Sequence, residues 1–267
     1  MTGVGPLPDN VAMRRLKLTI EYDGGNYHGW QSQRCGGTLQ DILEEKIGDI
    51  IRRPVRVTGA SRTDAGVHAL GQVAAFTCDS GLEAPVITRA LNAKLPPDIR
   101  ILRSEEAAAD FHPRYDALRK RYFYLVSLGA RRSAFVSRYM WNLPSRINFD
   151  MMEDSASLLR GCHDFSTFMG AGCSSKTQVR TVYELEVTRI ESISFMTSSL
   201  SGDFLKFSIE GNAFLRHMVR NIVGTLIEVG KGKLSIGELR RIFEAKDRTL
   251  AGPTAPAQGL FLEEITY

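Results

Sequence analysis

Residues 58–72 read Thr-Gly-Ala-Ser-Arg-Thr-Asp-Ala-Gly-Val-His-Ala-Leu-Gly-Gln, with apolar residues on both sides. The flanking segments 55–57 and 73–76 favour strands, which predicts that the stretch is a loop between two strands. Its glycines permit backbone conformations that other residues adopt only at a cost. Loops between strands are common places for reacting groups, and the candidates here are Arg62, Asp64 and His68. From residue chemistry alone, a turn in which Asp64 caps the following segment is the simpler interpretation.

Several blocks of the chain, taken in order, resemble one protein family. Arg-Thr-Asp-Ala-Gly-Val-His-Ala at residues 62–69 is similar to the signature loop of the TruA family of tRNA pseudouridine synthases. The block Asn-Ala-Phe-Leu-Arg-His-Met-Val-Arg-Asn-Ile-Val-Gly at residues 212–224 resembles a helix in the other half of that family's fold. Further similar pieces lie at residues 21–24 with 29–31, 111–114, 121–122 and 245–249. The resemblance therefore covers the chain from about Leu16 to the C-terminus.

The resemblance implies a role for particular residues. Asp64 would be the catalytic carboxylate, and Arg220 its ion-pair partner. Arg62 would assist extrusion of the target base, and Tyr122 would pack on the target uracil. The resemblance also implies that the substrate is tRNA, modified at positions 38–40 of the anticodon stem-loop by a homodimer. Whether the carboxylate attacks the ribose or takes a proton to give a glycal stays open.

Arg216 is the other candidate partner of Asp64. The sequence predicts a helix over residues 214–229, in which Arg216 and Arg220 are four residues apart and share one face. Contacts to RNA phosphates are expected from basic side chains. Those candidates are Arg114, Arg119–Arg121, Arg131, Arg132, Lys176, Arg180 and Arg216, with residues 170–177 as a loop able to close over RNA.

Composition narrows the class of protein. The 267 residues are 43% hydrophobic and 24% charged, as in an ordinary globular protein. A net charge of +4 permits a nucleic-acid partner without requiring one. We expect no membrane span and no leader. The four cysteines show no metal-type pairing, which favours free thiols in a reducing cytoplasm. Neither a dinucleotide-binding nor a P-loop motif occurs, so we expect no cofactor and no metal.

Periodicity and capping signals predict an α+β fold of two similar subdomains. By resemblance, their mainly antiparallel sheets adjoin and a basic cleft lies between them. The predicted divisions are a flexible tail at 1–13, an N-terminal subdomain at 14–115 and a C-terminal subdomain at 116–267. The predicted strands are 16–22, 99–103, 121–126, 181–190, 204–210 and 260–266. The first predicted helix begins at Thr38 and ends before Pro54. The other predicted helices are 85–95, 149–159, 214–229 and 235–243.

Two other functions stay open at this stage. One is a related synthase that acts on other RNA positions. The other is an RNA-binding or tRNA-folding module whose enzymatic activity is incidental.

Overall fold

The computed structural model describes residues 13–129, 133–134, 136–144, 146–195 and 197–267. The predicted tail, except for Met13, and the pair Arg131 and Arg132 lie outside the described residues. Contacts between residues divide the chain into two units. The first runs to Ala65 and resumes over Ala69–Ala117; the second comprises Gly66–His68 and Leu118–Tyr267.

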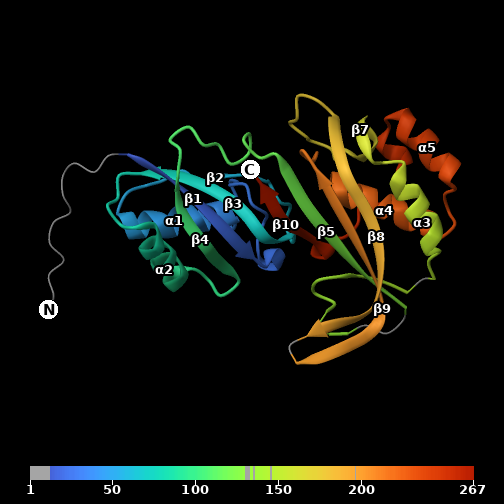
Figure 1. The fold of residues 1–267 in the computed structure, drawn as a ribbon, viewed down its shortest axis with the longest axis horizontal. Helices are drawn as coiled ribbons and strands as arrows, with labels where there is room; N and C mark the ends of the chain where they lie inside the picture. The colour runs from blue at the N-terminus through green and yellow to red at the C-terminus, as the bar shows by residue number, and fades with distance from the viewer. Residues whose placement is uncertain (1–12, 130–132, 135, 145, 196) are drawn as a thin grey trace. The chain divides into compact units, whose positions relative to one another are not determined.

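The strands of the first unit pair antiparallel throughout (Figure 1). Their order is β4-β1-β3, and the short β2 pairs with β3. In β1 the side chains of Leu16, Leu18, Ile20 and Tyr22 are buried, so the predicted half-buried strand is confirmed. The strands are β1 (Arg14–Tyr22), β2 (Thr58–Gly59), β3 (His68–Cys78) and β4 (Ile99–Ala107).

Two predicted helices of the first unit are confirmed and lie side by side (Figure 1). α1 (Leu39–Ile51) is capped by Thr38, whose hydroxyl accepts a hydrogen bond from the Asp41 N–H. α2 (Ala84–Lys94) has proline in its first turn, where its missing N–H costs nothing.

The strand predicted over residues 55–57 is wrong. Both backbone groups of Val57 bond to side chains of α1: its N–H donates to Glu44 Oε1 at 2.9 Å, and Gln40 Nε2 donates to its carbonyl at 3.1 Å. These groups are therefore not available to a strand ladder. The pairing begins only at β2.

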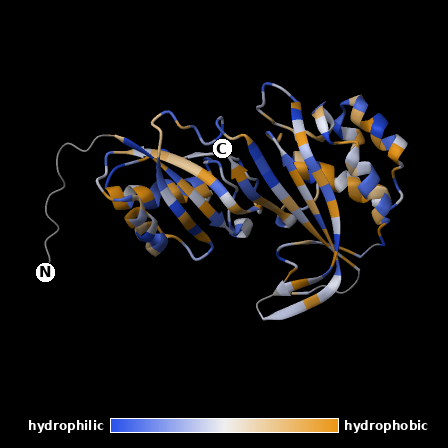
Figure 2. Ribbon diagram, viewed as in Figure 1, coloured by the Kyte–Doolittle hydropathy of each residue, from blue (hydrophilic) through white to orange (hydrophobic). Residues whose placement is uncertain are grey.

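In the second unit the strand order is β10-β5-β9-β8-β7 with antiparallel pairing, and β6 pairs parallel with β5. Hydrophobic and hydrophilic residues alternate along much of β8 (Figure 2). On β5 the aromatic and apolar side chains of Tyr122, Tyr124 and Val126 are buried. The strands are β5 (Arg119–Leu128), β6 (Trp141–Leu143), β7 (Gly161–Asp164), β8 (Val179–Phe195), β9 (Ser198–Gly211) and β10 (Leu260–Thr266).

The β8–β9 hairpin is longer than predicted. Its outer part is rich in serine and threonine, so hydropathy alone does not mark it as sheet. There Ile190, Ile193 and Leu200 pack against a buried cluster that includes Val136 and Met140. Burial against a distant segment thus extends the strands.

Three helices of the second unit lie close together (Figure 1). They are α3 (Phe149–Ser157), α4 (Met218–Gly230) and α5 (Ile236–Ala245). Ser235 caps α5 as predicted, and with Glu238 it forms a full capping box. α4 begins four residues later than predicted, because His217 is in the left-handed region at φ 60°. The prediction that Arg216 and Arg220 share a helix face is therefore wrong.

The α+β fold class with mainly antiparallel pairing is confirmed.

Gly224 allows the backbone of α4 to touch the backbone of the segment that contains Pro253. A Cβ placed there would lie 1.7 Å from the Pro253 carbonyl oxygen, far inside any allowed contact. We expect Gly224→Ala to lower the free energy of unfolding by about 1–3 kcal/mol or more, because the segment would have to move. Urea denaturation followed by circular dichroism measures this change.

Gly237→Ala is the matched control. Gly237 lies in α5, and apart from its chain neighbours and the backbone of its own helix no atom lies within 4 Å of a Cβ built on it. Alanine should therefore raise stability by up to about 1 kcal/mol through helix propensity. Equal effects of the two substitutions would contradict the close approach at Gly224.

Candidate functional site

Asp64 lies half-buried on the turn between β2 and β3, directly after a firmly held residue. The preceding Thr63 is bonded through backbone and side chain: the Trp30 N–H donates to its carbonyl at 3.0 Å, and its hydroxyl lies 2.7 Å from the Tyr22 hydroxyl. Tyr22 and Thr63 are themselves buried. The backbone that carries the carboxylate therefore has a fixed position in the first unit.

Gly29 supports this turn from the other side. Its φ is +88°, and a Cβ there would lie 2.8 Å from the Thr63 carbonyl oxygen and 3.0 Å from the Ala65 nitrogen. Only glycine fits such a conformation and such a close approach. Gly29 and Trp30, the first two residues of the Gly-Trp-Gln piece at 29–31, thus lie against the backbone of the Asp64 turn.

Gln72 is a support that the sequence reading missed. Its side chain is fully buried on β3, donates to the Ser61 carbonyl at 2.8 Å and accepts from the Ser61 N–H at 3.2 Å. A polar residue inside an apolar strand was the available signal. Gln72 therefore fixes the backbone at Ser61, three residues before Asp64, in addition to the bonds that hold Thr63.

The chain after Asp64 passes into the second unit with Gly66–His68. His68 is buried there and stacks on Phe261, with ring centroids 4.6 Å apart. His68, one of the three reacting-group candidates of this loop, therefore packs among aromatic side chains of the second unit.

Arg220 is the third residue of α4 and is half-buried in the second unit. Its Nε donates to the Ala255 carbonyl at 2.7 Å. Burial raises the pKa of the neighbouring Tyr124 hydroxyl, and the positive charge of Arg220 opposes that rise. Asp64 belongs to the first unit and Arg220 to the second, so their pairing stays a prediction.

Arg216 precedes α4 and contacts the loop that carries Lys176. Its Nη1 donates to the Ala171 carbonyl at 3.0 Å, and its own carbonyl accepts from the Gly170 N–H at 2.8 Å. Lys176 lies exposed further along this loop. The structure thus links these two predicted site residues through residues 170–171.

Tyr122 is buried at the centre of β5, between Ile209 of β9 and Leu262 of β10. The Phe214 ring meets it edge to face, with centroids 5.2 Å apart. Phe214 was not singled out from the sequence as an aromatic partner.

The other predicted RNA-contacting residues differ in how far they are engaged. Arg62 and Arg114 are exposed, and Arg114 lies over the ring of Tyr115 at 5.8 Å. By contrast, Arg119 and Arg121 both bond to the buried Glu210, at 2.8 and 2.5 Å. These bonds, first that of Arg119, hold the pKa of Glu210 below its usual range. The two arginines therefore stabilise an internal carboxylate.

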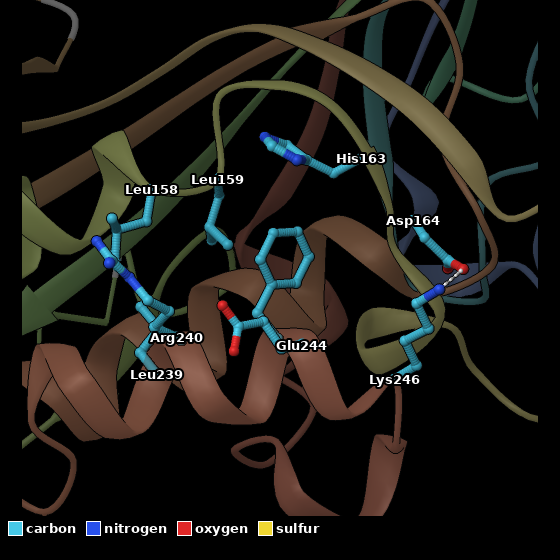
Figure 3. Close-up of a pocket in the computed structure, with 9 residues that line it drawn as sticks. Leu158, Leu159, His163, Asp164, Leu239, Arg240, Glu244 and Lys246 are labelled. Atoms are coloured by element: carbon cyan, nitrogen blue, oxygen red, sulfur yellow. Dashed lines mark ion pairs between the residues drawn. The ribbon is translucent and has the colours of Figure 1, made fainter.

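A pocket of about 350 Å³ lies elsewhere in the second unit (Figure 3). At its edge Lys246 Nζ lies 3.0 Å from Asp164, whose pKa is held low first by the Ser166 hydroxyl. None of the predicted site residues lines it. Its lining residues are Leu158, Leu159, His163, Asp164, Leu239, Arg240, Phe243, Glu244 and Lys246.

No helix in the described part of the chain is long and apolar enough to cross a membrane. Among the same residues, no three or more histidine, cysteine, aspartate or glutamate side chains are grouped so that they could hold a metal ion.

Known proteins resemble this chain over nearly its whole length. The tRNA pseudouridine synthase A of Thermodesulfovibrio yellowstonii is 43% identical over 255 residues, which is 96% of this chain and 100% of that protein. The proteins of the same name from Acetivibrio thermocellus and Geobacter sulfurreducens are 46% and 40% identical, with the same coverage. The family described as tRNA pseudouridine synthase matches residues 18–116 and 155–267. As the sequence blocks predicted, the chain belongs to the tRNA pseudouridine synthase family, a family of isomerases.

Proposed function

We propose that this protein converts uridine to pseudouridine at positions 38–40 in the anticodon stem-loop of tRNA. The observation that carries the proposal is the family match, which includes the segments of both Asp64 and Arg220. Full-length relatives named tRNA pseudouridine synthase A support the same substrate class.

The reaction is an isomerisation. The bond between uracil N1 and ribose C1′ breaks, and a bond between uracil C5 and C1′ forms. C5 loses its hydrogen as a proton and N1 gains a proton, so no electrons are exchanged. We assign Asp64 as the carboxylate that starts this exchange, either as nucleophile at the ribose or as the base that leads to a glycal. A carboxylate on an anchored turn suits such a step, because a reacting group must be held in place.

Arg220 is proposed to keep the Asp64 carboxylate ionised. A nearby opposite charge favours the charged form of a carboxyl group and so lowers its pKa. Arg220 stands in the first turn of α4, where unpaired N–H groups add positive potential. Both features suit an anionic partner.

Base flipping is the second proposed requirement, because the reacting atoms of a stacked uridine are not accessible. We assign Arg62, which is exposed two residues before Asp64, to the opening of the stack. Tyr122 is proposed to pack on the extruded uracil. Its edge-to-face contact with Phe214 holds the Tyr122 ring in one orientation.

Phosphate contacts are proposed for Arg114, Lys176 and Arg216, which are all exposed. Such contacts position RNA without reading its sequence. Arg216 has a second role in this proposal, because its bond to Ala171 holds the base of the loop that carries Lys176.

We also propose that the protein acts as a homodimer in the cytoplasm. Its cysteines are free thiols, which is typical of a reducing compartment. Light scattering after gel filtration should give twice the chain mass of 29.7 kDa. A mass of one chain at micromolar concentration would contradict the dimer.

Asp64→Asn should lower pseudouridine formation by about 10³-fold or more, because the amide is neither a nucleophile nor a base. The measurement is tritium release from uridine labelled at C5 in an unmodified tRNA transcript, alongside tRNA affinity by filter binding. Affinity should change little.

Asp110→Asn makes the same change at an exposed carboxylate and should leave the rate as it is. Full activity of Asp64→Asn would reject the catalytic assignment. A wild-type protein that binds tRNA but releases no tritium would favour the RNA-binding or tRNA-folding module. Mapping the pseudouridines formed tests the assignment to positions 38–40.

Lys176→Ala and Arg114→Ala should each weaken tRNA binding and reduce the slope of log K against log salt by about 1, because one phosphate contact is lost. Lys94→Ala is the control, since Lys94 lies on α2 and pairs with Asp49 at 3.9 Å. An unchanged salt slope in either variant would remove that residue from the RNA contacts.

A further inference from the structure

We propose that Arg248 is a positioning residue for Arg220, acting through a strap formed by residues 248–256. The inference rests on the catalytic role proposed for Arg220. It concerns a side chain to which neither the sequence reading nor the family match assigns a function.

The strap holds Arg220 at two points. Arg220 Nε donates to the Ala255 carbonyl at 2.7 Å, and the Ala255 N–H donates to the Arg220 carbonyl at 3.1 Å. Ala255 is fully buried. Because Nε–H lies in the plane of the guanidinium, its bond orients the whole planar group. The position of one buried carbonyl therefore sets the direction in which Arg220 presents its charge.

Arg248 holds the strap itself. One end of its guanidinium donates to the carbonyls of Ala251 and Gly252, at 3.4 and 3.0 Å. The other end donates to Thr254 Oγ1 at 3.0 Å and to Asn221 Oδ1 at 3.0 Å. A single side chain thus joins three residues of the strap to α4.

Asn221 couples this cluster to the residue next to Arg220. It is fully buried, and its Oδ1 also accepts from the Thr254 hydroxyl at 2.6 Å. Its Nδ2 donates to the Phe168 carbonyl at 2.8 Å. Rotation of the first turn of α4 would break all of these bonds together.

The strap has little room to adapt elsewhere. Its backbone touches α4 at Gly224, and the Gly252 N–H donates to Thr225 Oγ1 at 3.0 Å. At its far end Tyr124 donates to the Pro256 carbonyl at 2.8 Å. If Arg248 is removed, the carbonyls of Ala251 and Gly252 and the Thr254 hydroxyl lose their bonds to its guanidinium. The Ala255 carbonyl can then shift, and with it the Arg220 guanidinium.

The expected effect is on the rate of the chemical step. A displacement of about 1 Å at a reacting group can cost roughly 100-fold in rate. Arg248→Ala should therefore lower kcat on an unmodified tRNA transcript by about 10- to 100-fold, with KM and tRNA affinity within about twofold. Arg248→Lys should recover part of the rate, because an ammonium can keep some of these bonds but not the fork.

A double-mutant cycle with Arg220→Ala separates positioning from a general loss of stability. If Arg248 acts through Arg220, then Arg248→Ala should reduce kcat no further in the Arg220→Ala background. Arg160→Ala is the matched control: Arg160 also donates to a backbone carbonyl, that of Leu185, in the same unit. It should leave kcat unchanged at a temperature well below the Tm of every variant.

Three outcomes would overturn the inference. They are an unchanged kcat in Arg248→Ala, losses that multiply in the double variant, and a kcat loss in Arg160→Ala equal to that in Arg248→Ala. The proposed function fails in a different way, through a wild-type protein that forms no pseudouridine or an Arg220→Ala variant with full kcat.

Discussion

Close approach of backbone to backbone, which only glycine allows, is the constraint on which both candidate catalytic segments depend. In the first unit Gly29 lies against the Thr63–Ala65 backbone, and in the second Gly224 lies against Pro253. A side chain at either position would push apart two segments that are otherwise held by hydrogen bonds. Each contact supports an element that carries a charged residue of the proposed site. Local stiffness of this kind is what a reaction sensitive to small displacements requires.

Arginine serves a structural purpose in much of the second unit. Arg119 and Arg121 satisfy a buried glutamate, Arg216 bonds to the carbonyl of Ala171, and Arg248 bonds to the strap. The planar fork of five donors suits this use, because it can satisfy several oxygens at fixed angles. A mild net positive charge of +4 is therefore a poor measure of the charge that the protein offers to RNA. Exposed side chains such as Lys176 and Arg114 are better candidates for that contact.

Prediction from sequence succeeded where local signals decide structure. The strand with alternating Leu16, Leu18 and Ile20, and the helices capped by Thr38 and Ser235, lie where periodicity and capping indicated. It was wrong where distant groups compete for the backbone. Val57 bonds to side chains of α1 instead of joining a strand, and the left-handed His217 delays α4. Neither the bonding of Val57 nor the left-handed conformation of His217 can be recognised from the few residues around it in the sequence.

The sequence by itself determined the fold class, the family and the candidates Asp64, Arg220 and Tyr122, because these follow from periodicity and from ordered motifs. The tertiary structure decided what supports them: Gln72 and Gly29 around the Asp64 turn, Phe214 against Tyr122, and Ala255 with Arg248 around Arg220. It also placed Arg216 outside the helix, beside the loop of Lys176. The reason is physical: a motif specifies which groups are present, whereas hydrogen bonds and contacts between segments far apart in the chain set their orientation.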